Sequence, residues 1–127
     1  MSSGDRASAL GALYAFDARP LEALDASGLS RRAGQFAQGT VEHLDAIDAA
    51  ISAAADTWRL ERMAAVDRSI LRLGTFELLY TDMAVGIIIN EAVELAKEYS
   101  TAASGAFING VLSTVAGQRA ERSEPES

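Results

Sequence analysis

One segment, residues 64–81, constrains the fold most, because its pattern is helical yet apolar around nearly the whole circumference. Its main apolar stripe recurs every three or four residues and consists of Met63, Val66, Ile70, Leu73 and Tyr80. The other apolar side chains, spread over most of the remaining surface, are Leu71, Phe76, Leu78 and Leu79. A helix of this kind needs neighbours on several sides, so the segment predicts a central helix inside a helical bundle.

The rest of the chain also favours helix. Only two prolines occur, Pro20 and Pro125, and no segment alternates between apolar and polar residues as a strand does. We therefore predict an all-α protein of about seven helices, with Ser30 as the N-cap of the third. The expected elements cover residues 6–17, 21–26, 30–55, a short turn at 58–62, then 64–81, 87–100 and 104–117.

Length and composition indicate one compact domain. With 127 residues, of which 49% are hydrophobic, we expect a single domain over residues 1–117, followed by a disordered tail at 118–127. There is no cysteine and only one histidine, His43, which we expect at the surface, so no disulfide, metal site or cofactor is expected. The N-terminus lacks a signal-peptide pattern and no long apolar run occurs, which favours a cytoplasmic protein without a membrane segment.

The charge balance limits the ligands that this chain can bind. Eleven Lys and Arg residues against 18 Asp and Glu residues give a net charge of -7. Nucleic-acid affinity depends on cations placed against phosphates, so this balance argues against strong non-specific binding and leaves room only for a local basic patch. The densest basic segment contains Arg59, Arg62, Arg68 and Arg72.

Two of these arginines, Arg68 and Arg72, lie four residues apart on the side of helix 64–81 opposite its main stripe. One interpretation is a solvated face on which they pair with Asp67 and Glu61. The other is a patch that contacts phosphates through the bidentate geometry of arginine. The sequence leaves both interpretations open.

Glu77 falls on the apolar stripe of the same helix. A carboxylate in that position must be hydrogen-bonded or paired, because burying an uncompensated charge is costly. The candidate partners are Lys97 and a helix N-terminus, and contact with a protein partner is the alternative.

The last predicted helix carries two unusual residues beside its core stripe of Ile108, Val111, Leu112 and Val115. Phe107 is either the flank of the core or an exposed ring on which a base stacks. Gly110 lies nearly opposite the stripe, where a glycine costs about 1 kcal/mol relative to alanine. Either something approaches the backbone closely at Gly110, or a neighbouring helix packs there.

No catalytic signature is complete. Gly105 and Gly110 have the glycine spacing of a phosphate loop, but Val111 and Leu112 stand where Lys and Ser or Thr are required. No Ser, His and Asp set with a nucleophile elbow occurs. We therefore predict that the chain is not an enzyme.

Three blocks in the second half carry a family resemblance: residues 66–78 (VDRSILRLGTFEL), 89–97 (INEAVELAK) and 107–112 (FINGVL). Their order and spacing resemble the NusB family of bacterial transcription antitermination factors, well over residues 58–116 and weakly over 6–55. The resemblance implies two three-helix bundles set at a steep angle. It also implies binding of boxA-type RNA with the ribosomal protein NusE, within an RNA polymerase antitermination complex.

The helix pattern and the resemblance together suggest a set of RNA-binding residues. They are Arg6, Asp67, Arg68, Arg72, Phe107, Asn109 and Gly110. The sequence departs from the family where an arginine-rich start is replaced by Ser2, Ser3 and Gly4. Two functions therefore remain open: an antitermination factor that binds RNA weakly without NusE, or a NusB-like interaction domain or homodimer that has lost RNA binding.

Overall fold

The computed structural model describes residues 2–123, and their side chains as far as Arg119. These residues form six α-helices and one 3-10 turn and contain no strand, which confirms the all-α prediction. The elements are α1 (Ser3–Ala18), α2 (Arg31–Glu42), α3 (Leu44–Ala55), η1 (Leu60–Arg62), α4 (Ala65–Tyr80), α5 (Val85–Tyr99) and α6 (Ala102–Ser123).

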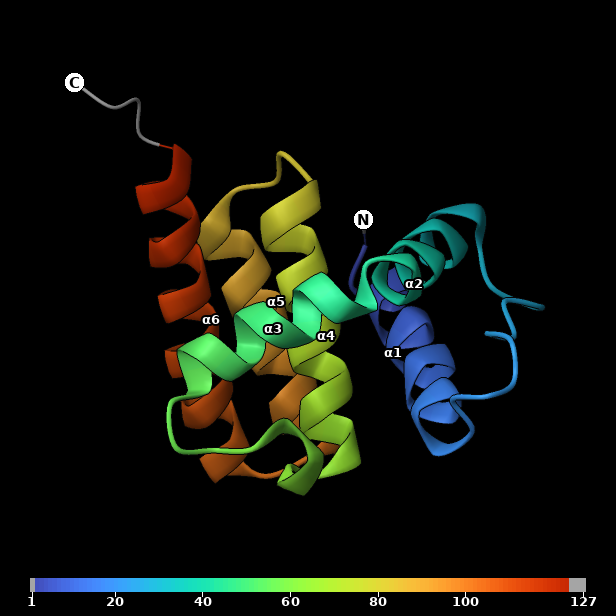
Figure 1. The fold of residues 1–127 in the computed structure, drawn as a ribbon. Helices are drawn as coiled ribbons and strands as arrows, with labels where there is room; N and C mark the ends of the chain where they lie inside the picture. Colours follow the sequence, from blue (N-terminus) through green and yellow to red (C-terminus); the bar gives the residue numbers. More distant parts are fainter. Residues whose placement is uncertain (1, 124–127) are drawn as a thin grey trace.

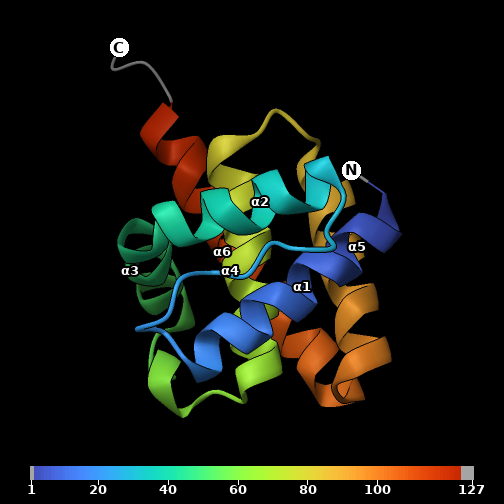
Figure 2. The same ribbon diagram turned by 90° about the vertical axis from the view of Figure 1, so that its right-hand side faces the viewer.

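Helix α4 is the central element, as the sequence predicted. Figures 1 and 2 show α1 and α2 on one side of it and α3, α5 and α6 on the others. Its side chains are buried on several faces, including Ile70, Leu71, Leu73 and Leu78. Because α4 lies against every other α-helix, it joins the two groups of helices into one fold.

Two clusters of buried apolar side chains meet at α4. The smaller cluster joins α4 to α1 and α2 and consists of Ala9, Leu13, Ala33, Ala37 and Leu73. The larger cluster joins α4 to α3, α5 and α6 and includes Ile51, Ile70, Leu95 and Leu112. Each group of helices therefore has its own apolar contact surface on α4.

Two predicted helices differ from the structure. Residues 21–26 form turns and irregular chain instead of a short helix. Leu21 there is fully exposed and only Leu24 packs against the smaller apolar cluster, and so short a segment gains little from forming a helix. The predicted helix 30–55 is two helices, α2 and α3, although Ser30 is the N-cap, as expected, and its hydroxyl accepts the Ala33 N–H at 3.1 Å.

The break between α2 and α3 lies at His43, which has φ −107° and ψ 22°. The change of direction places α2 beside α1 while α3 lies against α4 and α6 (Figure 1). Gly39 permits the close approach of α2 to α4, because a Cβ there would lie 2.5 Å from the Phe76 ring. His43 is exposed, as predicted, and its ring stacks on Tyr80 with centroids 4.1 Å apart.

Both ends of the described chain contain more helix than expected. Helix α1 begins at Ser3 instead of Arg6, because Ser2 and Asp5 form a capping box. Helix α6 continues to Ser123, so residues 118–123 of the predicted disordered tail are helical. The segment contains Gln, Arg, Ala and Glu, which favour helix. Residues 124–127 of that predicted tail lie outside the described residues.

Candidate functional site

The seven predicted site residues separate into two groups. Arg6 and Asp67 are buried, and Arg68 and Arg72 are largely buried. Phe107 is half-buried, whereas Asn109 and Gly110 are exposed. The structure therefore does not bring the seven side chains together on one surface.

Arg6 forms a buried ion pair with Glu77, in which both side chains are 2% exposed. Its Nη2 donates to the carboxylate at 2.7 Å and also contacts the Met83 sulfur, while Nε donates to both carboxylate oxygens at 3.2 Å. Burial raises the pKa of Glu77, and the Arg6 guanidinium opposes that shift. The predicted pairing of Glu77 is confirmed, but the suggested partner was wrong, since Lys97 pairs with Glu94 instead. Arg6 therefore ties α1 to α4.

Arg68 is directed towards the end of α1 and the η1 turn. Its Nη2 and Nε donate to Asp17 at 2.6 and 3.0 Å. Its Nη1 donates to the carbonyl oxygens of Leu60 and Met63, both at 3.0 Å. Four hydrogen bonds within the protein leave this guanidinium little capacity for phosphate, and Asp67 is not among its partners.

Arg72 completes the same charged network. It donates through Nη1 to Asp17 at 2.8 Å and through Nε to Asp48, also at 2.8 Å. The hydrogen bond from Arg68 is the main cause of a lowered pKa for Asp17, although burial opposes it. The interpretation of this side as a solvated face, with Glu61 as a partner, was wrong, because α1 and α3 cover this side of α4.

Asp67 anchors the start of α6 to α4. Its carboxylate accepts the hydroxyl of Ser100 at 2.7 Å and that of Ser104 at 2.8 Å. The Ser104 N–H is in turn bonded to the Thr101 hydroxyl at 3.1 Å. Asp67 thus fixes the helix that carries Phe107, Asn109 and Gly110.

A hollow of about 320 Å³ lies between η1 and the first turns of α6. It is lined by Trp58, Arg62, Met63, Ala64, Asp67, Ala103, Ser104 and Phe107. The Trp58 and Phe107 rings meet edge to face, with centroids 5.6 Å apart. Sequence analysis did not select Trp58 as a site residue, although it is the only tryptophan in the chain and is 62% exposed in the structure.

The structure shows the surroundings of the two unusual residues of α6. Phe107 packs against the larger apolar cluster, as a residue on the flank of the core does, and the ring also borders the hollow. A Cβ placed on Gly110 would have no neighbour within 4 Å, so no helix of the described chain packs there. The exposed side of α6 therefore offers open backbone at Gly110 beside the Asn109 amide.

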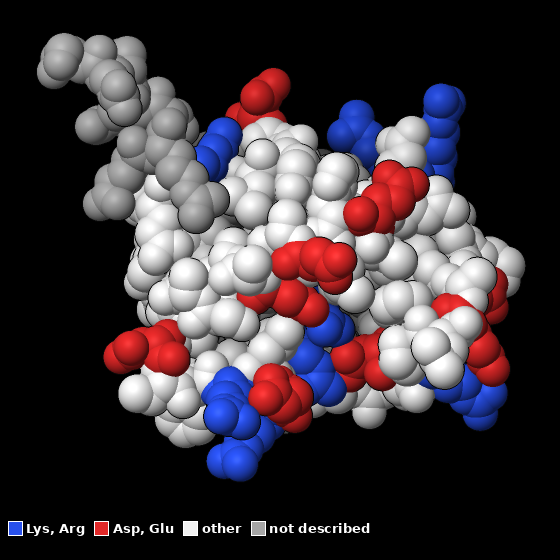
Figure 3. All heavy atoms as spheres, viewed as in Figure 1, with Lys and Arg blue, Asp and Glu red and all other residues white. Residues whose placement is uncertain are grey.

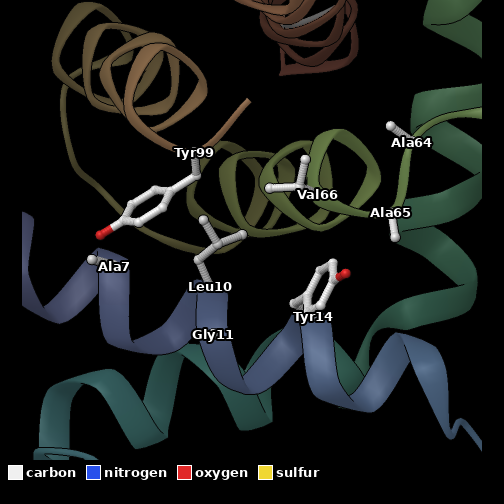
Figure 4. Close-up of a pocket in the computed structure, with 8 residues that line it drawn as sticks. All are labelled: Ala7, Leu10, Gly11, Tyr14, Ala64, Ala65, Val66 and Tyr99. Atoms are coloured by element: carbon white, nitrogen blue, oxygen red, sulfur yellow. The ribbon is translucent and has the colours of Figure 1, made fainter. Parts of the chain in front are cut away.

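A second hollow of about 520 Å³ lies between α1 and the first turn of α4. Figure 4 shows Tyr14 and Tyr99 flanking Leu10 and Val66 in this groove. Both tyrosines are about half exposed, at 51% and 49%. Exposed aromatic side chains around an apolar floor are typical of protein interfaces.

Charge on the surface is mixed. In Figure 3, Lys and Arg side chains are separated by Asp and Glu, with no continuous basic strip on the face shown. Within the described residues, no group of three or more His, Asp or Glu side chains is placed to hold a metal ion. The described helices also include none that is long and apolar enough to cross a membrane.

The structure is that of a small all-α protein, with two groups of helices around a central helix and two surface hollows in which ligands could bind. The NusB family model matches residues 4–117, and the chain belongs to this family. The transcription antitermination protein NusB of a Nitratiruptor species is 43% identical over 122 residues, covering 87% of this chain and 88% of the relative. The NusB of Anaeromyxobacter dehalogenans is 56% identical over 79 residues, and this match spans only 56% of that relative's length.

Solved structures agree with the family assignment. Thermotoga maritima NusB superposes with a TM-score of 0.81 at 34% identity, covering 93% of this chain and 92% of that one. A NusB from a complex of the antitermination factors NusB and NusE with dsRNA gives a TM-score of 0.79 at 27% identity, covering 91% and 96%. The predicted family and fold are confirmed, and the relatives are named as antitermination factors, which agrees with the prediction of a non-enzyme.

Proposed function

We propose that this protein is a transcription antitermination factor that binds boxA-type RNA together with NusE. It acts in the cytoplasm as part of an RNA polymerase antitermination complex. The main support is the family match over residues 4–117, together with the likeness to a NusB that forms a complex with NusE and dsRNA. The two hollows supply one candidate surface for each ligand.

The RNA surface that we propose is the exposed side of α6 together with the Trp58 and Phe107 hollow. Phe107 offers an aromatic edge, Asn109 an amide and Gly110 open backbone. Single-stranded RNA is recognised through such stacking and polar contacts, in addition to phosphate charge. The role of the buried Arg6 in this proposal is to fix α1 against α4, and Asp67, Arg68 and Arg72 likewise hold the scaffold.

A matched pair of glycine variants tests this surface. Gly110→Gln places a side chain on the exposed side of α6, where a Cβ meets no neighbour, and should weaken RNA binding at least several-fold. Gly86→Gln makes the same change on α5, also in open space, and should leave RNA binding unchanged. Both affinities are measured by anisotropy of a labelled boxA-type RNA in the presence of NusE. Equal affinities for the two variants would remove this side of α6 from the interface.

The protein partner NusE is assigned to the groove between α1 and α4. Its apolar floor at Leu10 and Val66 and its two half-exposed tyrosines suit a protein surface better than a polyanion. Gly11 lines the groove and a Cβ there meets nothing within 4 Å, so Gly11→Gln fills the groove without disturbing the fold. Calorimetric titration with NusE should show a loss of affinity.

The control for that experiment is Gly34→Gln on α2. It also adds a side chain to a helical glycine in open space but lies outside the groove. It should bind NusE as the unmodified protein does. Unchanged NusE binding by Gly11→Gln would place the partner on another surface.

The second candidate function is a NusB-like interaction domain, or a homodimer, that has lost RNA binding. The net charge of -7 and the burial of Arg6, Arg68 and Arg72 within ion pairs favour it. It predicts that NusE, or a second copy of the chain, binds while a boxA-type RNA does not bind even with NusE present. Anisotropy with NusE added in excess separates the two functions, and sedimentation at increasing protein concentration detects the homodimer.

A further inference from the structure

We propose that the hollow between η1 and α6 takes one unpaired nucleobase, stacked on the exposed indole of Trp58 beside Phe107, with Arg62 on the adjoining phosphate. This inference rests on the proposed RNA-binding function and names the contact that recognises the RNA. It gives a role to Trp58, a residue that the packing of the core does not require.

The exposure of Trp58 supports this proposal. It is the largest apolar side chain in the chain, yet 62% of its surface remains accessible. Its backbone is held in place by the turn that ends α3, where its N–H donates to the Ala55 carbonyl oxygen at 3.1 Å and Asp56 takes a positive φ of 57°. An exposed indole provides a flat surface on which a base can stack.

Phe107 is the ring that contacts Trp58. The two rings meet edge to face, both line the hollow, and Phe107 also packs on the apolar core. The ring is therefore held by the core instead of moving freely. The contact with Phe107 on α6 supports the indole from one side, and the exposed surface of Trp58 is left for a planar ligand; we call this part of the hollow the notch.

The hollow also carries a positive charge, that of Arg62. Arg62 lines the hollow, is exposed and has no ion-pair partner among the described residues. This distinguishes it from Arg68 and Arg72, which are paired with carboxylates. A guanidinium beside two aromatic rings matches a nucleotide, which carries a flat base and a phosphate.

The polar side chains that line the hollow are held by hydrogen bonds within the protein. Asp67 and Ser104 line the hollow and bond to each other at 2.8 Å. Asp67 is also bonded to Ser100, so the anchor of α6 is independent of any ligand. The notch is therefore preformed, which limits the conformational cost of binding a base.

Trp58 is the single tryptophan of this chain, so all indole emission from the chain reports on this residue. The full chain is titrated with a short boxA-type RNA, with NusE held in excess, and Trp58 emission is followed beside the anisotropy of a label on the RNA. The emission of NusE with RNA but without this chain is subtracted. Stacking on a base should quench Trp58 with the same midpoint as the anisotropy change.

Two variants separate the contacts. Trp58→Leu should weaken RNA binding roughly 5- to 150-fold, the range for removing one base stack. Arg62→Gln should weaken it with a salt slope lower by about one. Tyr80→Leu is the matched control, an exposed aromatic residue that lines neither of the two hollows, and should leave RNA binding unchanged.

An abasic scan of the RNA completes the test. Removing one base at a time keeps every phosphate, so a single position should lose both the quenching and the affinity. RNA that binds by anisotropy without quenching Trp58, or a Trp58→Leu variant that binds normally, would overturn the base notch and leave the proposed function intact. Quenching by NusE alone would assign the hollow to the protein partner, and no anisotropy change under any condition would overturn the proposed function as well.

Discussion

The buried ion pair between Arg6 and Glu77 gives the sharpest prediction about stability. Glu77→Leu removes the carboxylate and leaves the Arg6 guanidinium buried with its bonds to both carboxylate oxygens lost. Breaking a buried pair in this way costs about 3 to 5 kcal/mol, because the guanidinium loses its carboxylate partner while it remains out of water. That is a large share of the roughly 5 to 15 kcal/mol that stabilises a domain of this size.

The double variant Arg6→Met with Glu77→Leu should recover most of the loss. It replaces both charges by apolar side chains of similar length, and such replacements are often neutral or stabilising. Urea unfolding of the two single variants and the double variant gives the coupling energy as a double-mutant cycle. Lys97→Met breaks the exposed pair with Glu94 and serves as the control, with an unchanged midpoint expected. Additive losses in the cycle, or a Glu77→Leu loss no larger than that of the control, would refute this account of how α1 is held.

Three further predictions concern stability. Ile70→Ala and Leu112→Ala should each destabilise the fold by about 2 to 5 kcal/mol in urea unfolding, since both side chains are buried in the larger cluster, and midpoints that barely move would contradict that packing. Thr75→Val should stabilise by about 1 kcal/mol, because the Thr75 hydroxyl is buried and no described residue hydrogen-bonds to it, and a loss of stability would reveal a partner for it. The pKa of Asp17 lies below its ordinary value of 3.8, so the ionised carboxylate stabilises the fold above that pH, and this stabilisation is lost as pH falls through the folded-state pKa. Asp17→Asn should therefore reduce the loss of stability at acid pH. An unchanged acid loss would show that other carboxylates cause it.

Local patterns along the chain were enough to predict several features. The all-round apolar pattern of residues 64–81 correctly placed α4 at the centre, and Ser30 was correctly identified as a cap. Glu77 on an apolar stripe required a partner, and it has one. These predictions succeed because helix periodicity and capping depend on neighbouring residues.

Features that depend on distant contacts were not predictable from one sequence. Glu77 pairs with Arg6, which lies 71 positions away, and the helix pattern says nothing about which distant residue will be adjacent. Arg68 does project from the side of α4 opposite its stripe, but periodicity cannot tell whether solvent or another helix covers that side. Trp58 lines a hollow only because η1 meets α6 in the fold, and in the sequence it stands out only as a lone tryptophan after a helix break.

The central claim is that this chain recognises boxA-type RNA through a few stacking and polar contacts and needs NusE to do so tightly. The most direct test is to titrate that RNA into the protein alone and then into the protein with NusE, each at two salt concentrations. The account predicts weak binding with a shallow salt dependence for the chain alone, because few cations lie free to meet phosphates, and much tighter binding once NusE is present. Tight binding without NusE and with a steep salt dependence would contradict it, as would the absence of binding when NusE is present.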